Sequence, residues 1–272
     1  MIKYLILLLF TLNAYATPGT IVVLMQHNKV SAKSYIVTDN EEKVIIESNA
    51  DTPRPIASIT KLMTAIVVLD ANQDLEEDVP IVFKNHDYLH SKIPKSVKTL
   101  KRKELINLAI VKSDNLAAQT LCENYPGGLD RCIAEMNHKA FNLHMTQTHY
   151  EDPTGLNEKN VSSAKDLAKL VIHAKNYSEL IEASGKSQVE IKARKSWFRF
   201  GNTNPLVRDT NDIIISKTGF ITASGGCIAL LVNTSAGERA IILLGSRNTH
   251  SRIAEAKKIC MIVGHSDIEV TY

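Results

Sequence analysis

The sequence contains no Cys-x-x-Cys pair, no internal repeat and no low-complexity segment in its 272 residues. It also lacks a strong charge excess, since the formal net charge at pH 7 is only +3. The missing Cys-x-x-Cys argues against a thiol redox site or a zinc ribbon. The nearly balanced charge predicts no nucleic-acid partner, because such proteins carry a dense basic face. The length and the ordinary apolar content are sufficient for a sizeable core.

Long apolar runs are also missing. The N-terminal run, residues 4–10, is shorter than the roughly 20 residues that a bilayer requires. It follows Lys3 and precedes Ala14-Tyr15-Ala16, and this arrangement is typical of a cleaved signal peptide. We therefore expect residues 1–16 to be removed on export after Ala16, and residues 17–272 to form a single domain without a stable membrane anchor. An uncleaved anchor or a buried N-terminal strand is the alternative.

Export permits disulfides, and the chain has four cysteines. Cys122 and Cys132 flank a Pro-Gly-Gly turn between two helical stretches, so we expect them to form a bridge. Cys227 falls on a predicted strand and Cys260 on the last predicted helix, and the pattern leaves open whether these two pair across a layer. The alternative is four reduced thiols that pack as small hydrophobes.

Predicted strands lie at both ends of the chain, with helices between them. A hairpin is predicted over 34–48, helical spacing dominates 100–176, and a closing helix is predicted over 251–262. The apolar runs of strand length near the C-terminus are 213–218, 227–232 and 240–245. The order predicts an α/β fold with α+β layers, in which both chain ends build one sheet and a helical subdomain, roughly 75–190, is inserted.

The stretch from Pro55 to Ala65 reads as a turn that leads into a helix. Positions i and i+3 share one helix face, so Lys61 would hold its amine beside the hydroxyl of Ser58. A hydroxyl becomes a nucleophile when a base takes its proton, and a lysine with a lowered pKa is such a base. The pair alone is a weak signal, because Ser162 and Lys165 have the same spacing at an ordinary helix N-terminus.

Two further motifs make the signal specific. Ser113-Asp114-Asn115 lies at a joint in an apolar helical stretch, and Lys217-Thr218-Gly219 ends an apolar strand. Ser-x-x-Lys, Ser-Asp-Asn and Lys-Thr-Gly form the signature of penicillin-binding proteins and class A β-lactamases. With the stretches 152–156 and 160–164, the chain resembles the low-molecular-weight D-alanyl-D-alanine carboxypeptidase/endopeptidase family.

Within that family the chain is most similar to the periplasmic D,D-endopeptidases, because Asn211-Asp212 precede the strand and no further β-domain follows the closing helix. The resemblance implies a β-lactamase/transpeptidase-like fold, with an antiparallel sheet flanked by helices. It implies a periplasmic serine peptidase that acts on peptidoglycan stem peptides without a cofactor or metal, and that β-lactams inhibit covalently. The expected bond is a D-alanyl cross-link, the alternative is a terminal D-alanine, and the oligomeric state is left open.

The chemistry and the resemblance assign the same roles. Ser58 is the expected nucleophile, Lys61 is its base, and Ser113 relays a proton to the departing amine. The residues expected to bind substrate are Asn115, Lys217, Thr218, Gly219, Phe220 and Arg252. Asn115 is expected to orient Lys61 as well as to bind a substrate amide, and the positive charge of Lys217 is expected to help keep Lys61 neutral. The N–H groups of Ser58 and Phe220 are the expected oxyanion hole.

Three other functions compete with this interpretation. A class A β-lactamase also needs a glutamate that activates water, and the chain has no Glu-x-x-Leu-Asn, so a penicillin acyl-enzyme should persist. A zinc hydrolase is suggested only by His86 and His90, whose spacing resembles His-Glu-x-x-His but lacks its glutamate. A wall-binding protein with a decayed site is disfavoured because Ser58, Lys61 and Lys217 are all intact.

Replacing the nucleophile tests this interpretation. The variant Ser58→Ala should lose all covalent labelling by a fluorescent penicillin, because no other hydroxyl is expected to attack the lactam. Its circular dichroism spectrum should match that of the unaltered protein. Labelling that persists in a folded Ser58→Ala variant would show that the nucleophile has been assigned wrongly.

Overall fold

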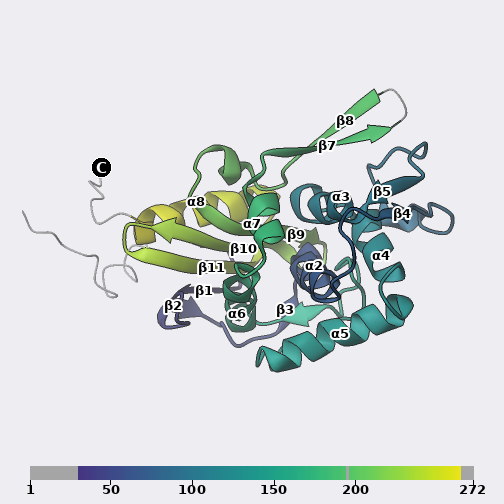
Figure 1. Cartoon of the computed structure of the whole chain (residues 1–272). Helices are drawn as coiled ribbons and strands as arrows, with labels where there is room; N and C mark the ends of the chain where they lie inside the picture. Colours follow the sequence, from purple (N-terminus) through teal and green to yellow (C-terminus); the bar gives the residue numbers. More distant parts are fainter. Residues whose placement is uncertain (1–29, 194–195, 265–272) are drawn as a thin grey trace, which may run out of the picture.

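The computed structural model describes residues 30–193 and 196–264 (Figure 1). The expected signal peptide and its cleavage after Ala16 lie outside the described residues. None of the helices within these ranges combines the length and the apolar character that crossing a bilayer requires.

The structure is built on one five-stranded antiparallel sheet with the strand order β2-β1-β11-β10-β9. Its strands are β1 (Ser34–Asp39), β2 (Val44–Ser48), β9 (Ile213–Ile221), β10 (Gly225–Thr234) and β11 (Gly237–Ser246). The two strands near the N-terminus pair with the C-terminal group through β1 and β11. A sheet assembled from both chain ends is therefore confirmed.

Helices cover both faces of this sheet (Figure 1). They are α8 (Thr249–Gly264) on one face, and α6 (Ala164–Ala174) and α7 (Ser178–Gly185) on the other. Along β10, Ile228 and Leu230 face α8, whereas Ala229 and Leu231 face the opposite core. Because both faces of the sheet are buried, its strands read as continuous apolar runs.

The second part of the molecule surrounds α2 (Thr60–Asp70). Every residue of α2 from Thr60 to Val68 is buried, as expected for a helix that is apolar nearly all round. Its neighbours include η3 (Leu108–Lys112), α4 (Asn115–Glu123) and α5 (Gly128–Asn142), and α3 (Arg102–Asn107) packs in turn on η3 and α4. The helices of the segment 75–190 thus lie in two places, because α4 and α5 pack around α2 whereas α6 and α7 pack on the sheet.

Smaller elements complete the described chain. Short turns of helix are η1 (Ala57–Ile59), η2 (Asp87–Leu89) and η4 (Pro205–Arg208). Two short ladders join β3 (Arg54–Pro55) to β6 (Val161–Ser162) and β4 (Asp78–Pro80) to β5 (Thr99–Lys101). A longer hairpin, β7 (Gln188–Ala193) with β8 (Ser196–Gly201), projects from the body (Figure 1). Neither this hairpin nor α7 was predicted from the sequence.

The cysteines are partly as predicted. Cys122 and Cys132 form a disulfide between α4 and α5, with their Cα atoms 5.3 Å apart, which confirms the expected bridge. Cys227 and Cys260 are free thiols. Cys227 packs in the core on the α6 side of the sheet, whereas Cys260 packs with the cluster beneath α8. The sheet lies between these two thiols, so the second pairing does not form.

Removal of the bridge should destabilise the fold. In the chain-entropy account, a bridge between cysteines 10 residues apart contributes roughly 3 kcal/mol to the free energy of unfolding. The variant Cys122→Ala/Cys132→Ala should lose about this amount in urea unfolding. Cys260→Ala, which removes a free and half-buried thiol, should change it by less than about 1 kcal/mol. Equal losses in the two variants would contradict the expected contribution of the bridge.

Candidate active site

Ser58 lies on the tight turn η1, directly before α2. Ala57 in this turn has a positive φ of 48°, a strained value for a residue with a side chain. The loop at Gly155 presses against it, since a Cβ added to Gly155 would lie 1.9 Å from the carbonyl oxygen of Ala57. Gly155 also has a positive φ of 78°. Only glycine satisfies both requirements at this position.

Strand β9 approaches the same turn. A Cβ added to Gly219 would lie 2.8 Å from the oxygen of Ile56 and 2.9 Å from the nitrogen of Ser58. Glycine is therefore required here so that the strand backbone can lie beside the nucleophile. Phe220 is the next residue along β9, so the two amides expected to form the oxyanion hole belong to neighbouring segments.

Lys61 is fully buried one turn after Ser58. Its Nζ lies 2.9 Å from Ser58 Oγ, 2.8 Å from Asn115 Oδ1 and 2.5 Å from the carbonyl oxygen of Thr154. The Asn115 amide donates its Nδ2 hydrogen to the carbonyl of Leu89 at 2.8 Å. Because that contact requires the NH₂ group, the amide oxygen faces Lys61.

These three contacts suit a neutral amine. A neutral –NH₂ group donates two hydrogen bonds and accepts one, and two of its neighbours, the Asn115 and Thr154 oxygens, only accept. The nitrogen lone pair is then directed at the Ser58 hydroxyl, from which it can take the proton. Burial lowers the pKa of Lys61 from 10.5 to about 7, while the charges of Asp152 and Asp114 raise it. Burial is the main cause of this shift, and the charge of Lys217, which we expected to help, is not among its causes.

Ser113 is held beside the second lysine. The π-helical segment η3 ends at Lys112, and Ser113 then takes a left-handed conformation with a φ of 60°. The buried Nζ of Lys217 donates a hydrogen bond to Ser113 Oγ at 2.8 Å. Burial lowers the pKa of Lys217, and the nearby charges of Lys61 and Arg252 lower it further.

Asp114 fixes the joint that carries Ser113. Its carboxylate caps α4 by accepting from the N–H of Ala117. It also accepts from the Ser91 hydroxyl and from the N–H of Lys92, both at 2.9 Å. The joint is therefore tied to the loop 86–93, whose Leu89 carbonyl orients Asn115.

The other predicted binding residues line β9. Thr218 donates its hydroxyl hydrogen to the hydroxyl of Thr203 at 2.7 Å. The guanidinium of Arg252, which reaches across from α8, donates to the carbonyl of Gly219. Arg252 therefore contacts the backbone of the strand that borders the site. The predicted set is brought together around Ser58 from η1, α2, the η3–α4 joint, β9 and α8.

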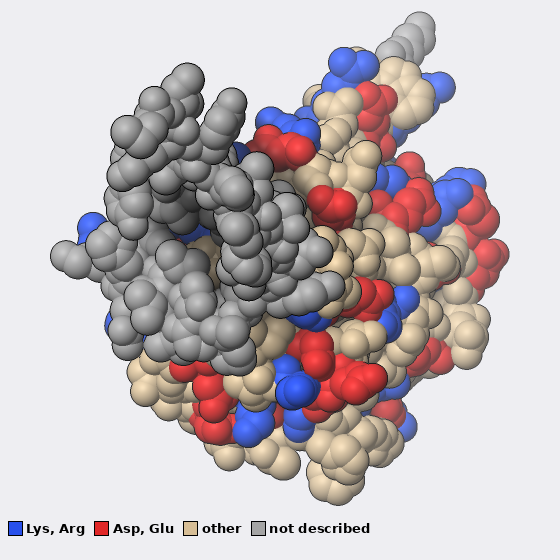
Figure 2. Space-filling model, turned by 90° about the vertical axis from the view of Figure 1, so that its left-hand side faces the viewer, with Lys and Arg blue, Asp and Glu red and all other residues tan. Residues whose placement is uncertain are grey.

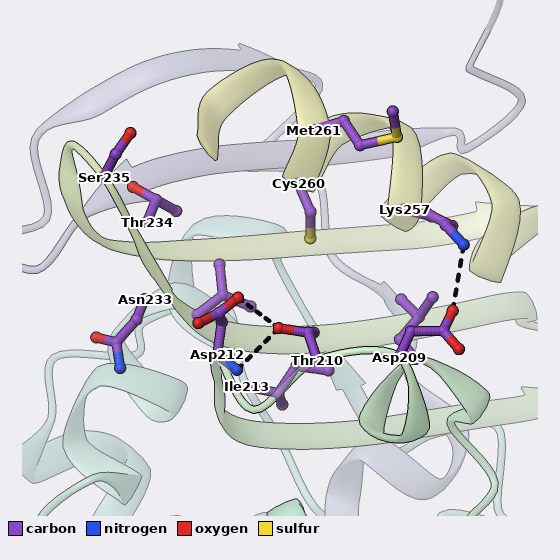
Figure 3. Close-up of a pocket in the computed structure, with 12 residues that line it drawn as sticks. Asp209, Thr210, Asp212, Ile213, Asn233, Thr234, Ser235, Lys257, Cys260 and Met261 are labelled. Atoms are coloured by element: carbon purple, nitrogen blue, oxygen red, sulfur yellow. Dashed lines mark hydrogen bonds and ion pairs between the residues drawn. The ribbon is translucent and has the colours of Figure 1, made fainter. Parts of the chain in front are cut away.

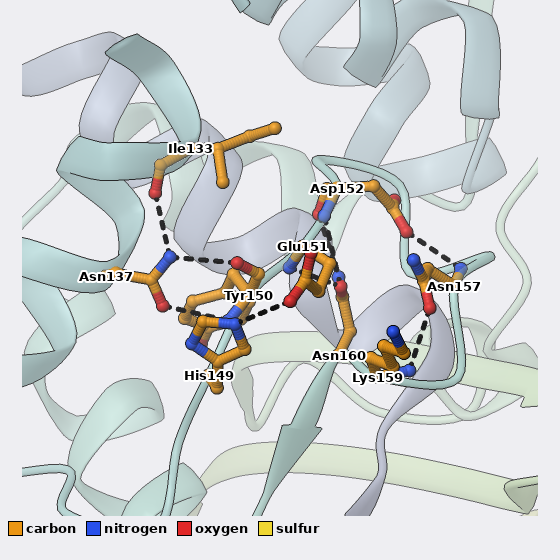
Figure 4. A network of polar contacts seen from close by, with 9 residues as sticks. All are labelled: Ile133, Asn137, His149, Tyr150, Glu151, Asp152, Asn157, Lys159 and Asn160. Atoms are coloured by element: carbon orange, nitrogen blue, oxygen red, sulfur yellow. Dashed lines mark hydrogen bonds and ion pairs between the residues drawn. The ribbon is translucent and has the colours of Figure 1, made fainter. Parts of the chain in front are cut away.

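A polar network that was not predicted holds the loop 149–160 (Figure 4). The carboxylate of Asp152 accepts hydrogen bonds from the N–H groups of Thr154, Gly155 and Asn157. The side chain of Asn160 spans the base of the loop, bonding to Asp152 and to Thr60 on α2. This network sets the position of the Thr154 carbonyl that faces Lys61. An Asp followed by Thr-Gly is a turn signal in the sequence, but it does not reveal the lysine partner.

Two other features lie apart from this site. His86 contacts the carbonyl of Val82 and the carboxylate of Glu123, and no group of His, Cys, Asp and Glu within the described ranges is arranged to hold a metal ion. A hollow of about 460 Å³ lies between α8 and the ends of β9 and β10, with Ile213 and Cys260 among its lining residues (Figure 3). None of the motif residues lines this hollow.

The chain is similar to a known family of enzymes and to several known proteins. The family D-alanyl-D-alanine carboxypeptidase matches residues 21–245. A D-alanyl-D-alanine endopeptidase of Escherichia coli is 34% identical over 92% of this chain and 82% of the relative. A D-alanyl-D-alanine endopeptidase of Pseudomonas aeruginosa is 32% identical over 86% and 77%. The E. coli D-alanyl-D-alanine carboxypeptidase DacA is 27% identical over 85% and 60%.

Solved structures share the fold. The Streptomyces K15 DD-transpeptidase superposes with a TM-score of 0.80 at 25% identity, over 86% of this chain and 97% of that one. Penicillin-binding protein D2 from Listeria monocytogenes, bound to cefotaxime, superposes with a TM-score of 0.78 at 26% identity, over 86% and 98%. The β-lactamase/transpeptidase-like fold predicted from the motifs is therefore confirmed.

The lowered pKa of Lys61 predicts a pH dependence. The rate of acylation by a chromogenic β-lactam should rise between about pH 5 and about pH 9, because only the neutral amine accepts the serine proton. The half-maximal rate should lie near pH 7, at the pKa of Lys61.

A charge change beside the amine checks the assignment. Asn115→Asp places a carboxylate at the position 2.8 Å from Nζ. It should move the midpoint upward by about one pH unit or more, because an opposite charge favours the ammonium form. Constant circular dichroism across the range serves as the control. A rate that is flat through pH 7, or a midpoint that falls in Asn115→Asp, would contradict the role of Lys61.

Proposed function

The chain belongs to the D-alanyl-D-alanine carboxypeptidase family of serine D,D-peptidases, and on that premise we propose that it is a D,D-endopeptidase that cleaves D-alanyl cross-links in peptidoglycan. The observation that carries the chemistry is the buried Lys61 amine, placed between two obligate acceptors and the Ser58 hydroxyl. A serine beside a buried amine of lowered pKa is an activated nucleophile. Ser162 and Lys165 have the same Ser-x-x-Lys spacing, but the hydroxyl of Ser162 forms a hydrogen bond with the hydroxyl of Thr148 and not with Lys165.

Acylation uses the residues that surround Ser58. Its Oγ attacks the carbonyl carbon of a D-alanyl peptide bond while Lys61 takes the hydroxyl proton. The oxyanion that forms is stabilised by the N–H groups of Ser58 and Phe220. The proton that Lys61 took passes to the departing amine through Ser113, whose Oγ lies 2.8 Å from the Nζ of Lys217. The C–N bond then breaks, leaving an ester on Ser58.

Substrate is held along β9. An edge strand offers backbone groups for an extended peptide, and β9 is at the edge of the sheet. Lys217 and Thr218 contribute a cation and a hydroxyl toward substrate carboxylate or amide groups. Arg252 adds a second positive charge behind Gly219. Water then hydrolyses the ester and frees the product carboxylate.

A β-lactam also acylates Ser58, and the resulting ester is hydrolysed slowly. Rapid release requires a carboxylate that activates water. In the loop beside Ser58, the two oxygens of Asp152 are occupied by the N–H groups of Thr154, Gly155 and Asn157. Asp152 is thus poorly suited to that task, which supports a persistent penicillin acyl-enzyme in place of lactamase turnover.

The proposed substrate, peptidoglycan, lies outside the cytoplasmic membrane, so the enzyme must be exported to reach it. The proposal includes cleavage of the signal peptide after Ala16, release of residues 17–272 into the periplasm, and a part in remodelling the wall that determines cell shape. The endopeptidase assignment is supported by relatives of that name at 32–34% identity, against 27% for the E. coli carboxypeptidase DacA.

Purified muropeptides distinguish the two reactions. Mature protein, residues 17–272, is incubated separately with a D-alanyl cross-linked dimer and with an uncross-linked pentapeptide monomer, and products are identified by chromatography and mass spectrometry. We expect conversion of dimer to monomers. Ser58→Ala is the inactive control. Loss of one alanine from the pentapeptide with dimers untouched would instead establish a carboxypeptidase.

A further inference from the structure

The hairpin β7–β8 has one face that the reaction chemistry does not use. Its side chains alternate between two faces, as in any strand pair. The inward face, which includes Val189, Ile191 and Phe200, packs into the main core. The outward face carries the cross-strand pairs Lys192–Trp197 and Glu190–Arg199. We call this outward face of the hairpin the aromatic arm.

Trp197 dominates the aromatic arm. It is the only tryptophan of the chain, and its side chain is 62% exposed. The Nζ of Lys192 lies 5.9 Å from its ring centroid, and Arg199 Nε bonds to Glu190 at 2.6 Å beside it. Trp197 therefore presents an exposed apolar ring bordered by charged hydrogen-bonding groups, and it contributes little to the core.

The arm is anchored at the active site. Two residues after β8, the N–H of Thr203 donates to the carbonyl of Val111 at 3.0 Å, next to the Ser113 joint. The Thr203 hydroxyl also accepts from Thr218 of β9. Trp197 is six residues from Thr203, so the rise of a strand limits their separation to roughly 20 Å. The base of the arm therefore lies beside the Ser113 joint and β9, and Figure 1 shows the hairpin extending away from the body.

We propose that the aromatic arm binds the glycan strand of the wall polymer and so presents stem peptides to Ser58. This inference rests on the proposed function, since only a peptidoglycan substrate carries both parts. A sugar ring has an apolar face that stacks on an indole and hydroxyls that bond to flanking polar groups. The cations Lys192 and Arg199 outnumber the anion Glu190 on this face, and the net positive charge complements the carboxylates of the stem peptides.

The composition of the arm favours sugar over lipid. Surfaces that bind a bilayer insert several apolar side chains, whereas the aromatic arm offers one aromatic ring among three charged groups. The surrounding surface also mixes acidic and basic side chains, as Figure 2 shows for the projection at its upper right. A second contact with the polymer raises the local concentration of its peptides at Ser58.

The single tryptophan provides a direct test. Glycan strands stripped of stem peptides are titrated into the full mature protein while Trp197 fluorescence is recorded. We expect a saturable change in emission. Vesicles containing anionic phospholipid, titrated in parallel, should cause none. A fluorescence change with vesicles and none with glycan would overturn the proposal in favour of a membrane contact.

Variants then test the consequence for activity. Trp197→Ala should bind intact sacculi about five- to tenfold more weakly, and Trp197→Phe should retain part of the binding. Acylation by penicillin and cleavage of a cross-linked peptide dimer without sugars should be unchanged in both. Phe141→Ala, which removes another exposed ring (78% exposed, on α5), is the matched control.

The outcomes separate the two proposals. Equal sacculus binding by the unaltered protein and a folded Trp197→Ala would overturn the aromatic arm. Equal losses in Trp197→Ala and Phe141→Ala would do the same, because the effect would then be nonspecific. Failure of the unaltered protein to cut the sugar-free dimer would instead contradict the endopeptidase assignment, while the glycan titration would still report on the arm.

Discussion

The buried amine of Lys61 is the constraint on which the rest of the structure depends. An ammonium in this position is costly, because burial removes its hydration, and its pKa falls to about 7 as a result. The fold keeps the amine in place with oxygens from three segments far apart in sequence, at Ser58, Asn115 and Thr154. A structural change that displaced one of these oxygens would alter both the pKa of Lys61 and the direction of its lone pair.

The layers follow from this requirement. The apolar helix α2 carries Lys61 into the core, and β9 brings Gly219 against the Ser58 turn from the sheet. The loop at Gly155 closes the other side, supported by the network around Asp152 and Asn160. From the opposite face of the sheet, Arg252 of α8 reaches the same region and donates to the carbonyl of Gly219. The aromatic arm adds a surface for the polymer without altering the chemistry.

The sequence predicted the parts whose signals are local. Apolar runs bounded by turn residues identified the sheet strands, and the three motifs identified Ser58, Lys61 and the residues that now surround them. The Thr154 carbonyl was missed, because a backbone acceptor has no residue signature. The hairpin β7–β8 was missed although Val189 and Ile191 alternate with polar residues, a pattern too short to be distinctive. The fate of Cys227 and Cys260 depended on which face of β10 each thiol could reach, which only the register decides.

The most direct measurement of the central claim is the titration of Lys61 itself. Lysines labelled with ¹³C at Cε would be followed by NMR as pH is raised, and Lys61→Arg would identify the resonance. We expect the resonance that disappears in Lys61→Arg to titrate near pH 7, at the pKa of Lys61. A Lys61 signal that titrates near its usual 10.5 would mean that the amine is charged at neutral pH. It could not then take the serine proton.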